Sequence, residues 1–240
     1  MKVFLQKHQG EFVNVNIYTA FRGFQDRGYE TLFFESSEIN LLPLDEHSIV
    51  VGGIPLVLIA LRQLGIEPPA LPSIPEVLLS YAKRRVWTST LGEVRSNFME
   101  GRRVFIKPLP ADRKLFTGQV ISSFRDLIET ASLPLDYPVL CSDPIDFRTE
   151  YRAFVMDGEI IGLRYYTGDF RLFPDYEVIA SAVVDYQPAP SAYSIDFGVS
   201  GEGATILVEV NDAYALGCYG LSPSLYSALI ERRWQELRNE

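Results

Sequence analysis

The chain has 240 residues, 47% of them hydrophobic, and a formal net charge of −9 at pH 7. A chain of this length can bury a substantial core, as one large domain or as two or three small lobes. The acidic balance argues against nucleic acid as the main partner, because phosphate backbones recruit basic surfaces.

Only two cysteines, Cys141 and Cys218, and two histidines, His8 and His47, are present. Their number and separation argue against a disulfide framework and against a thiolate or imidazole metal site, so any metal is expected to be a hard, oxygen-bound cation. The longest apolar stretch is interrupted by glycines, a proline and an arginine, and the first residues lack the zones of a secretory signal. We therefore expect a cytoplasmic protein with no membrane partner.

Apolar spacing predicts a small α/β lobe at the start of the chain. Strands are expected at residues 3–5, 31–34 and 49–51. Helices are expected near residues 17–27 and 55–64, with Gly28 and Gly65 ending them. Residues 67–75 contain four prolines, which force an extended path and remove backbone donors. We place the first domain boundary there, so that residues 1–75 form one lobe.

From residue 76 onward the pattern predicts an α+β domain extending to residue 240. Asp157-Gly158 is the tight-turn dipeptide of a β-hairpin between residues 151–156 and 159–166. A second hairpin is expected between residues 193–199 and 205–210. The other predicted elements are helices through Tyr81 and at 91–99, 124–131 and 223–238, with strands at 104–106 and 138–141. We divide this domain into a first subdomain, 76–141, and a second, 142–240.

Three oxygen-bearing side chains converge on the second hairpin. Glu209 and Asn211 are two positions apart on one strand and so share a face, and Asp196 lies on the other strand. Magnesium prefers oxygen donors and is commonly shared with substrate phosphates, so this set suits it. The alternative is that Asp196 faces solvent and that Asn211 belongs to a turn after the strand.

Lys107 ends a strongly apolar strand, where a lone cation is costly unless it faces a partner such as a phosphate. Residues 114–118 offer a further cation, a hydroxyl and a glycine in a loop that could lie over phosphates. Glu150 and Arg152 share a face of their strand. The alternatives are a lysine at a sheet edge that reaches water and an ordinary cross-strand ion pair.

The order of these features along the chain resembles the ATP-grasp superfamily. The strongest similarity lies in Ser194-Ile-Asp-Phe-Gly198 and Leu207-Val-Glu-Val-Asn211, which are similar to the paired metal-binding strands of that family. Phe105-Ile-Lys-Pro108, Phe116-Thr-Gly118 and Glu150-Tyr-Arg-Ala-Phe-Val155 look most like its short members, the R2K clade. The resemblance implies two α+β subdomains that clamp ATP, preceded by a small Rossmann-like lobe.

The resemblance also implies roles for individual residues. Lys107 would hold the α and β phosphates and act with Arg152, which would face the transferring phosphate. Glu150 would take the ribose hydroxyls. The loop that closes over the triphosphate would include Lys114, Thr117 and Gly118, and the hinge whose backbone meets adenine would comprise Leu140, Cys141 and Ser142. Mg²⁺ would be held by Asp196, Glu209 and Asn211.

The chain departs from the family in lacking a phosphate-binding lysine far upstream, since the nearest candidates are Lys83, Arg84 and Arg85. We expect an ATP- and Mg²⁺-dependent ligase that joins a carboxylate to an amine through an acyl phosphate, with small molecules or peptides as substrates. The alternatives are a phosphotransferase on the same fold and a non-catalytic, nucleotide-binding or virion-associated protein. The sequence leaves the oligomeric state open.

Overall fold

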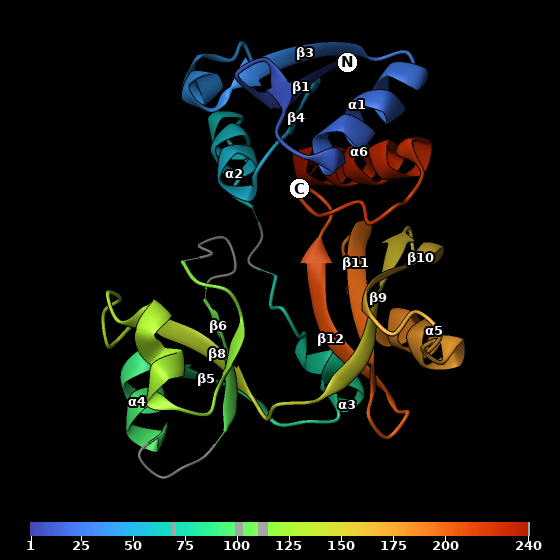
Figure 1. Cartoon of the computed structure of the whole chain (residues 1–240). Coiled ribbons are helices and arrows are strands. Elements are labelled where there is room, and N and C mark those ends of the chain that lie inside the picture. Colours follow the sequence, from blue (N-terminus) through green and yellow to red (C-terminus); the bar gives the residue numbers. More distant parts are fainter. Residues whose placement is uncertain (69–70, 99–102, 110–114, 240) are drawn as a thin grey trace.

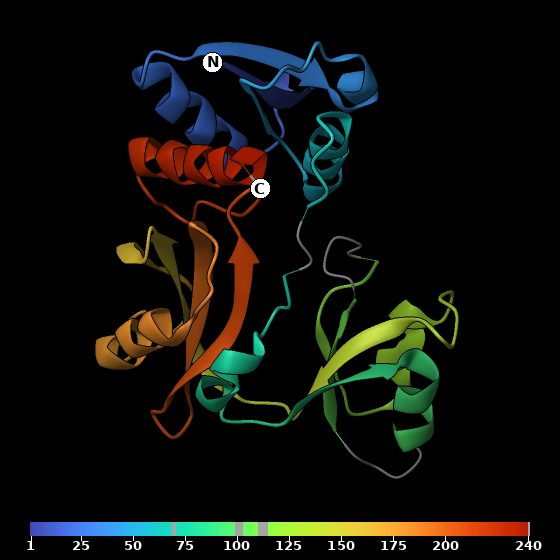
Figure 2. The same cartoon turned by 180° about the vertical axis from the view of Figure 1, so that it is seen from behind.

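The computed structural model describes residues 1–68, 71–98, 103–109 and 115–239. Its strands form three sheets of four strands each. Figure 1 shows one sheet at the top of the molecule and the other two facing each other below it, and Figure 2 shows the same arrangement from behind. The α+β class predicted from the sequence is confirmed.

The top sheet belongs to the N-terminal lobe, where β1 pairs in parallel with both β3 and β4. Asn14 caps α1, because its side chain accepts hydrogen bonds from the backbone N–H groups of Asn16 and Ile17. The predicted strands and helices of this lobe are confirmed, and the short β2 and η1 are additions. The elements are β1 Lys2–His8, β2 Glu11–Phe12, α1 Val15–Asp26, β3 Glu30–Glu35, η1 Ser36–Leu41, β4 Ser48–Val51 and α2 Ile54–Gln63.

The helix α6, Pro223–Asn239, packs on this lobe although it follows every other element in sequence. Its buried Leu229 and Trp234 belong to the same hydrophobic cluster as Val3 and Leu5 of β1. The approach of α6 to α1 is very close at Gly23, where an added Cβ would lie 1.9 Å from the carbonyl oxygen of Pro223. Glycine is therefore required at that crossing.

The second sheet has the order β5-β8-β6-β7 and is covered by α4. The predicted strands at 104–106 and 138–141 and the helix at 91–99 are found, whereas the helix predicted at 124–131 is a 3-10 helix, and β5 and β7 were missed. The predicted boundary at residue 75 falls directly before η2. The elements are η2 Glu76–Leu78, α3 Leu79–Ala82, β5 Val86–Thr90, α4 Leu91–Phe98, β6 Val104–Pro108, β7 Gln119–Ile121, η3 Phe124–Thr130 and β8 Pro138–Ser142.

The third sheet is antiparallel throughout, with the order β10-β9-β11-β12. Both predicted hairpins are confirmed. At the first turn Asp157 and Gly158 have φ values of 51° and 82°, the left-handed conformation that tight hairpin turns require. The helix α5 was missed. The elements are β9 Phe147–Met156, β10 Glu159–Gly168, α5 Tyr176–Asp185, β11 Ala192–Ser200 and β12 Thr205–Asp212.

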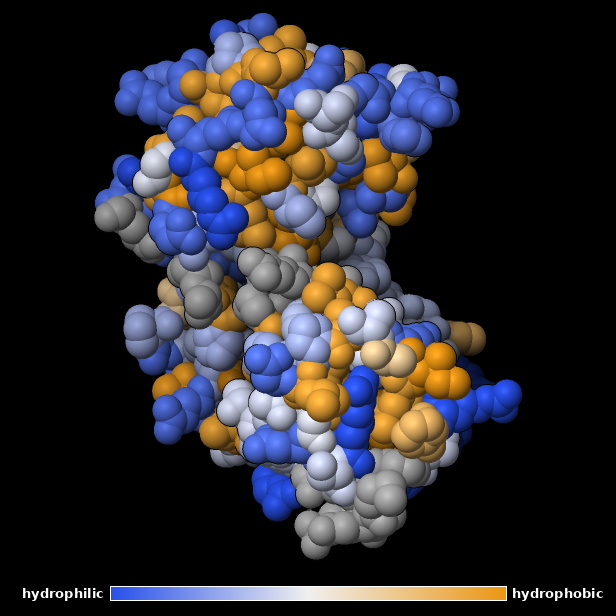
Figure 3. Space-filling view, turned by 90° about the vertical axis from the view of Figure 1, so that its left-hand side faces the viewer, coloured by the Kyte–Doolittle hydropathy of each residue, from blue (hydrophilic) through white to orange (hydrophobic). Residues whose placement is uncertain are grey.

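Apolar side chains also reach the surface, including Leu41 of η1 and Phe124 and Ile128 of η3. Figure 3, which views the side where these helices lie in Figure 1, shows apolar areas interspersed with charged ones on both the upper lobe and the lower subdomain. Such scattered exposure is ordinary for a folded domain. Within the part of the chain that the structure describes, no helix has the length and apolar character needed to span a membrane.

Candidate active site

Three of the predicted site residues form a row across the third sheet. Asp196 on the central strand β11 is directly opposite Arg152 on β9 and Glu209 on β12. Directly opposite residues on neighbouring strands point to the same face, so the three side chains are neighbours. Asn211 extends the row, because its amide nitrogen donates to Oε1 of Glu209 at 3.0 Å.

Arg152 and Asp196 form a bidentate pair in the middle of this row. Nε of Arg152 donates to Oδ1 of Asp196 at 2.8 Å, and Nη2 donates to Oδ2 at 2.6 Å. The Arg152 side chain is 8% exposed and that of Asp196 is 1% exposed. Such forked pairs fix the plane of the guanidinium group. Glu209 lies farther off, with its Oε1 at 3.9 Å from Nη2 of Arg152.

Lys107 reaches this row from the facing sheet. It lies on β6, and its Nζ is 3.0 Å from Oε2 of Glu209. The Lys107 side chain is 15% exposed and that of Glu209 is 31% exposed, so their contact is partly open to solvent. The alternative reading of Lys107 as a strand-end lysine that only reaches water is therefore wrong. The contact joins the two lower sheets seen in Figure 1.

The charges in the row are shifted by burial and by one another. Burial raises the pKa of Asp196 to about 6, although Arg152 opposes this rise. Burial alone would lower the pKa of Arg152, but the bonds and charge of Asp196 outweigh it and raise that pKa. Burial likewise opposes ionisation of Glu209, yet the charge of Lys107 and the hydrogen bond from Asn211 lower its pKa. Glu209 is therefore ionised at neutral pH.

The predicted hinge residues alternate between two faces of the second sheet. Leu140 is directly opposite Lys107 and so shares its face, and Ser142 lies two positions further along the same strand. Cys141 points the other way, into the hydrophobic cluster beneath α4, and burial raises its thiol pKa to about 11. Only the backbone of Cys141 is therefore available to a ligand in front of Lys107.

The glycine of the predicted phosphate loop lies against the same strand. An added Cβ at Gly118 would lie 2.8 Å from the ring of Phe105 and 3.5 Å from Cβ of Lys107. The tight approach is to the ring of Phe105, whereas the distance to Lys107 is an ordinary van der Waals contact. Thr117 is exposed beside it. The predicted Lys114 lies outside the described residues.

Glu150 lies below the row on β9 and is bound by a tyrosine rather than by Arg152. The hydroxyl of Tyr166 donates to Oε2 of Glu150 at 2.6 Å. The alternative considered for Arg152, an ordinary cross-strand ion pair, is present, since Arg152 pairs with Asp196 on the neighbouring strand. Nη1 and Nη2 of Arg84 donate to the carbonyl oxygens of Leu207 and Val208 at 2.6 Å and 3.2 Å. These bonds attach the segment after α3 to β12.

The remaining upstream cations differ in surroundings. Arg85 stacks on Trp87, with its Cζ 4.3 Å from the centroid of the indole ring. Trp87 packs on the hydrophobic cluster of the first subdomain, on the α4 side of its sheet. Lys83 ends α3 in the left-handed conformation. Among the three candidates, Arg84 alone has a described contact with the strand that carries Glu209.

Two aromatic residues of the site were not predicted. The ring of Tyr219 lies over Arg152, with 4.7 Å between the ring centroid and Cζ. The centroids of the Tyr219 and Tyr166 rings are 5.0 Å apart. Tyr219 belongs to an irregular segment and carries no periodic signal, although the flanking Gly217 and Gly220 mark a tight turn.

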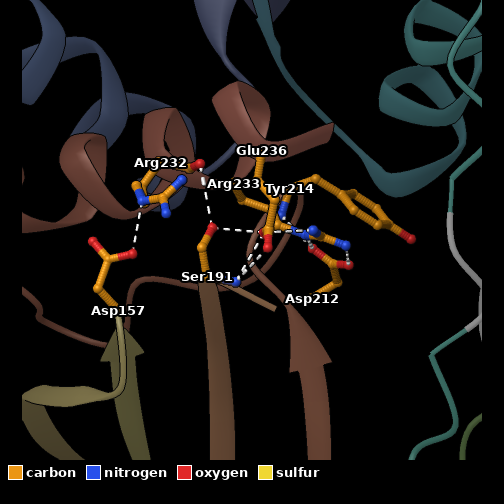
Figure 4. Close-up of polar contacts among 7 residues, drawn as sticks. All are labelled: Asp157, Ser191, Asp212, Tyr214, Arg232, Arg233 and Glu236. Atoms are coloured by element: carbon orange, nitrogen blue, oxygen red, sulfur yellow. Dashed lines mark hydrogen bonds and ion pairs between the residues drawn. The ribbon is translucent and has the colours of Figure 1, made fainter. Parts of the chain in front are cut away.

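A second buried arginine was also missed. Nε and Nη2 of Arg233 on α6 donate to the two carboxylate oxygens of Asp212, each at 2.9 Å. Figure 4 shows this pair beneath α6, with Glu236 and Ser191 beside it and with Tyr214 directed away from the cluster. Asp212 directly follows Asn211, so this network holds the end of the strand that carries Glu209.

Comparison with known proteins gives one family match. The model of the ATP-grasp domain, R2K clade family 2, matches residues 81–229. No curated protein sequence matches the chain. The match covers the second and third sheets, and with them every residue of the row.

Several solved structures share the fold. D-alanine–D-alanine ligase from Bacillus anthracis superposes with a TM-score of 0.61 and 13% identity, over 99% of this chain and 98% of that chain. D-cycloserine synthetase DcsG gives a TM-score of 0.59 and 11% identity, over 99% and 100% of the two chains. N5-carboxyaminoimidazole synthetase from Staphylococcus aureus gives a TM-score of 0.61 and 9% identity, over 97% of this chain and 77% of that chain. The predicted fold, with a small lobe before two clamping subdomains, is confirmed.

Proposed function

Because the chain belongs to R2K clade family 2 of the ATP-grasp proteins, we propose that it is an ATP- and Mg²⁺-dependent ligase that joins a carboxylate to an amine. The observation that carries the proposal is the meeting of Lys107 with Glu209 at 3.0 Å, since it brings the two sheets' charged groups to one point. Three similar folds belong to a ligase and two synthetases, which supports this reaction class.

Phosphoryl transfer depends mainly on positioning and on neutralising charge. In the proposed assignment, Lys107 holds the α and β phosphates and Arg152 faces the transferring group. Glu150, already an acceptor for Tyr166, takes a ribose hydroxyl with its other lone pairs. The backbone of Leu140, Cys141 and Ser142 meets the adenine edge. The loop of Lys114, Thr117 and Gly118 covers the triphosphate.

The row offers oxygen donors of the kind that a magnesium ion prefers. Glu209 and Asn211 present a carboxylate and an amide at hydrogen-bond distance, and Asp196 is directly opposite Glu209. No group of three or more histidine, cysteine or acidic residues gathers in the described part of the chain. Magnesium needs no such group, because one or two carboxylates and substrate phosphates usually hold it. The donor set therefore fits.

Within this set Asp196 differs from Glu209. Both oxygens of Asp196 accept from Arg152, whereas Glu209 shares its oxygens between Lys107 and Asn211 and is more exposed. Glu209 and Asn211 would thus be the first ligands, with Asp196 completing the site beside them. When bound, magnesium neutralises charge on the phosphate oxygens.

The reaction balances in two steps. A carboxylate oxygen of the substrate attacks the γ-phosphorus of ATP, the bond from that phosphorus to the β,γ-bridging oxygen breaks, and ADP leaves. An amine then attacks the acyl carbon of the acyl phosphate, inorganic phosphate leaves with the electron pair of the carbon–oxygen bond, and the phosphate takes up the proton that the amine nitrogen loses. Lys107 and Arg152 offset the negative charge that develops on the transferring group.

Mass spectrometry of reactions with Mg-ATP and pools of amino acids, small carboxylic acids and peptides tests the proposal. New amides formed together with ADP and phosphate are expected. A phosphorylated product that accumulates without an amide would identify a phosphotransferase instead. Tight ATP binding without any turnover would identify a non-catalytic nucleotide-binding protein.

Glu209→Gln is the matched variant, because it keeps the size of the side chain and removes its charge. We expect turnover to fall by about a hundredfold or more and the dependence on magnesium to weaken, while the protein stays folded. Turnover equal to that of the parent would show that Glu209 holds no metal.

A further inference from the structure

The segment between β12 and α6 has an unusual backbone at Tyr219. Its φ is 41°, and the φ of the following Gly220 is 81°. Glycine adopts this left-handed region freely, but a tyrosine does so at a cost and only where its surroundings hold it. The conformation therefore points to contacts that fix Tyr219 in place.

The segment is tied on both sides of the tyrosine. The backbone N–H of Cys218 donates to Oδ1 of Asn16, at the start of α1, at 2.9 Å. The carbonyl oxygen of Gly220 accepts from Nε of Arg164 on β10 at 3.1 Å. Tyr219 is thus held between a contact to the N-terminal lobe and a contact to the third sheet.

The ring of Tyr219 meets the site described above. It lies over the guanidinium group of Arg152, at 4.7 Å, and against the ring of Tyr166, with 41° between the ring planes. Gly217 leaves room for it, because an added Cβ there would lie 2.8 Å from Cε2 of Tyr219. Nearly half of Tyr219, 44%, is still exposed, so the residue is not simply part of the core.

These contacts act on Arg152 in two directions. Asp196 holds the edge of the guanidinium group through two hydrogen bonds, and Tyr219 covers one of its faces. An aromatic face attracts a cation and keeps water from it, which strengthens the effect of the charge on a nearby anion. The edge contact aligns the group with the carboxylate, and the ring adds a second contact on its face.

We propose that Tyr219 is a positioning residue for Arg152, held in a left-handed conformation so that its ring fixes the guanidinium group toward the terminal phosphate of ATP. The inference rests on the proposed function, in which Arg152 faces the transferring phosphate. It predicts that loss of the ring affects ligands with a γ-phosphate more than ligands without one.

Calorimetric titration of the full chain with Mg-AMPPNP and with Mg-ADP tests the proposal. Tyr219→Leu keeps a Cβ in the same backbone conformation and loses the ring, whereas Tyr219→Phe keeps the ring and loses the hydroxyl. We expect Tyr219→Leu to lower the affinity for AMPPNP about fivefold and the affinity for ADP by less than about twofold. Tyr219→Phe should bind both like the parent.

Two more variants separate the ring from its surroundings. Tyr219→Gly relieves the backbone cost and removes the ring, so it should be folded and show the same selective loss of AMPPNP. Tyr165→Leu removes a tyrosine of similar exposure, 40%, from the nearby strand β10 and should leave both affinities unchanged. In an Arg152→Met background, Tyr219→Leu should produce no further loss.

The outcomes are distinct. The positioning role would be overturned by any of three results. Tyr219→Leu could weaken the affinities for AMPPNP and ADP equally, or Tyr219→Phe could lose as much affinity for AMPPNP as Tyr219→Leu. In the Arg152→Met background, Tyr219→Leu could cause a further, additive loss of affinity. If the parent protein binds neither nucleotide, the proposed function fails, and the inference fails with it. Parent-like binding of AMPPNP by Tyr219→Leu would overturn the inference alone.

Discussion

Two buried arginine–aspartate pairs share one hydrogen-bonding pattern and differ in what surrounds them. In both pairs Nε and Nη2 of the arginine donate to the two carboxylate oxygens. The distances are 2.8 Å and 2.6 Å from Arg152 to Asp196, and both are 2.9 Å from Arg233 to Asp212. Nη1 of Arg233 also donates to Glu236 at 2.6 Å, and Ser191 donates to the same carboxylate from its N–H and its hydroxyl. The pair beneath α6 therefore has further protein partners, as Figure 4 shows.

The Arg152–Asp196 pair is equally buried but lies beside a partly exposed carboxylate. Its nearest further carboxylate is Glu209, which is bound to Lys107 from the other sheet and is 31% exposed. The same bidentate pair thus serves two purposes. When other protein groups saturate it, it holds elements together, and when a solvent-accessible charged group lies beside it, it can respond to a ligand. The following predictions test this difference.

Arg233→Met should have the largest effect on stability. Removing the arginine, whose side chain is 2% exposed, leaves the buried Asp212 without its partner, which typically costs about 3–5 kcal/mol. Urea denaturation measures the change. The neighbouring Arg232, whose ion pair with Asp157 is largely exposed, is the control, and Arg232→Met should cost less than about 1 kcal/mol. Equal costs would contradict the structural role of Arg233.

Arg152→Met should destabilise the fold in a pH-dependent way. Burial raises the pKa of Asp196 to about 6 even beside Arg152, and loss of the arginine raises it further. A carboxyl group with a raised folded pKa contributes stability at low pH and loses it as the pH rises through that pKa. Urea denaturation should therefore show that the variant's free energy of unfolding is lower than the parent's by about 3 kcal/mol at pH 8 and by much less at pH 5.

The double variant Arg152→Met/Asp196→Asn controls this prediction. It has no titrating carboxyl group at residue 196, so the difference between pH 5 and pH 8 should disappear. A pH dependence that persists in the double variant would assign the effect to another group.

Lys107→Met should weaken ATP binding with little effect on the fold. A lysine that contacts two phosphates makes charge-assisted bonds of about 1.5–3 kcal/mol, so the affinity for ATP should fall about ten- to a hundredfold. Adenosine, which has no phosphate, should bind unchanged, and calorimetry with both ligands measures the contrast. An unchanged affinity for ATP would remove Lys107 from the proposed site.

Arg171→Ala should have the smallest effect. Arg171 is exposed, and its side chain and backbone N–H donate to Asp169, whose pKa they lower to about 2. Loss of the side chain should raise that pKa part of the way toward 3.8, as NMR titration measures, without changing the melting temperature at pH 7 or the affinity for AMPPNP. A change in either quantity would show that Arg171 contributes beyond its local pair with Asp169.

The hairpins were predictable because their signal is local. Alternating side chains and a turn dipeptide define β9 and β10, and alternation also puts Glu209 and Asn211 on one face. The resemblance implied only that Lys107 and Glu209 serve one ATP site, and their direct contact was not predicted, since no local pattern brings together two sheets. The pairing of β9 with β11, which aligns Arg152 with Asp196, has no local signal either.

There are physical reasons why the sequence did not predict the remaining residues and strands. Arg233 is a charged residue of an amphipathic helix, and such residues normally face solvent, so its burial depends on Asp212. Tyr219 lies in a segment without periodicity. The strand β5 has no clear alternation of buried and exposed residues, and β7 has only three residues, too few to show one. Each case depends on tertiary contacts that the sequence alone does not display.

The packing of α6 on α1 has a consequence for synthesis on the ribosome. The sheet of the N-terminal lobe is translated long before Leu229 and Trp234, which complete its core. Translation runs at about 5–20 residues per second, so the nascent lobe waits on the order of ten seconds with an apolar face uncovered. During that interval the lobe exposes apolar surface of the kind that favours aggregation.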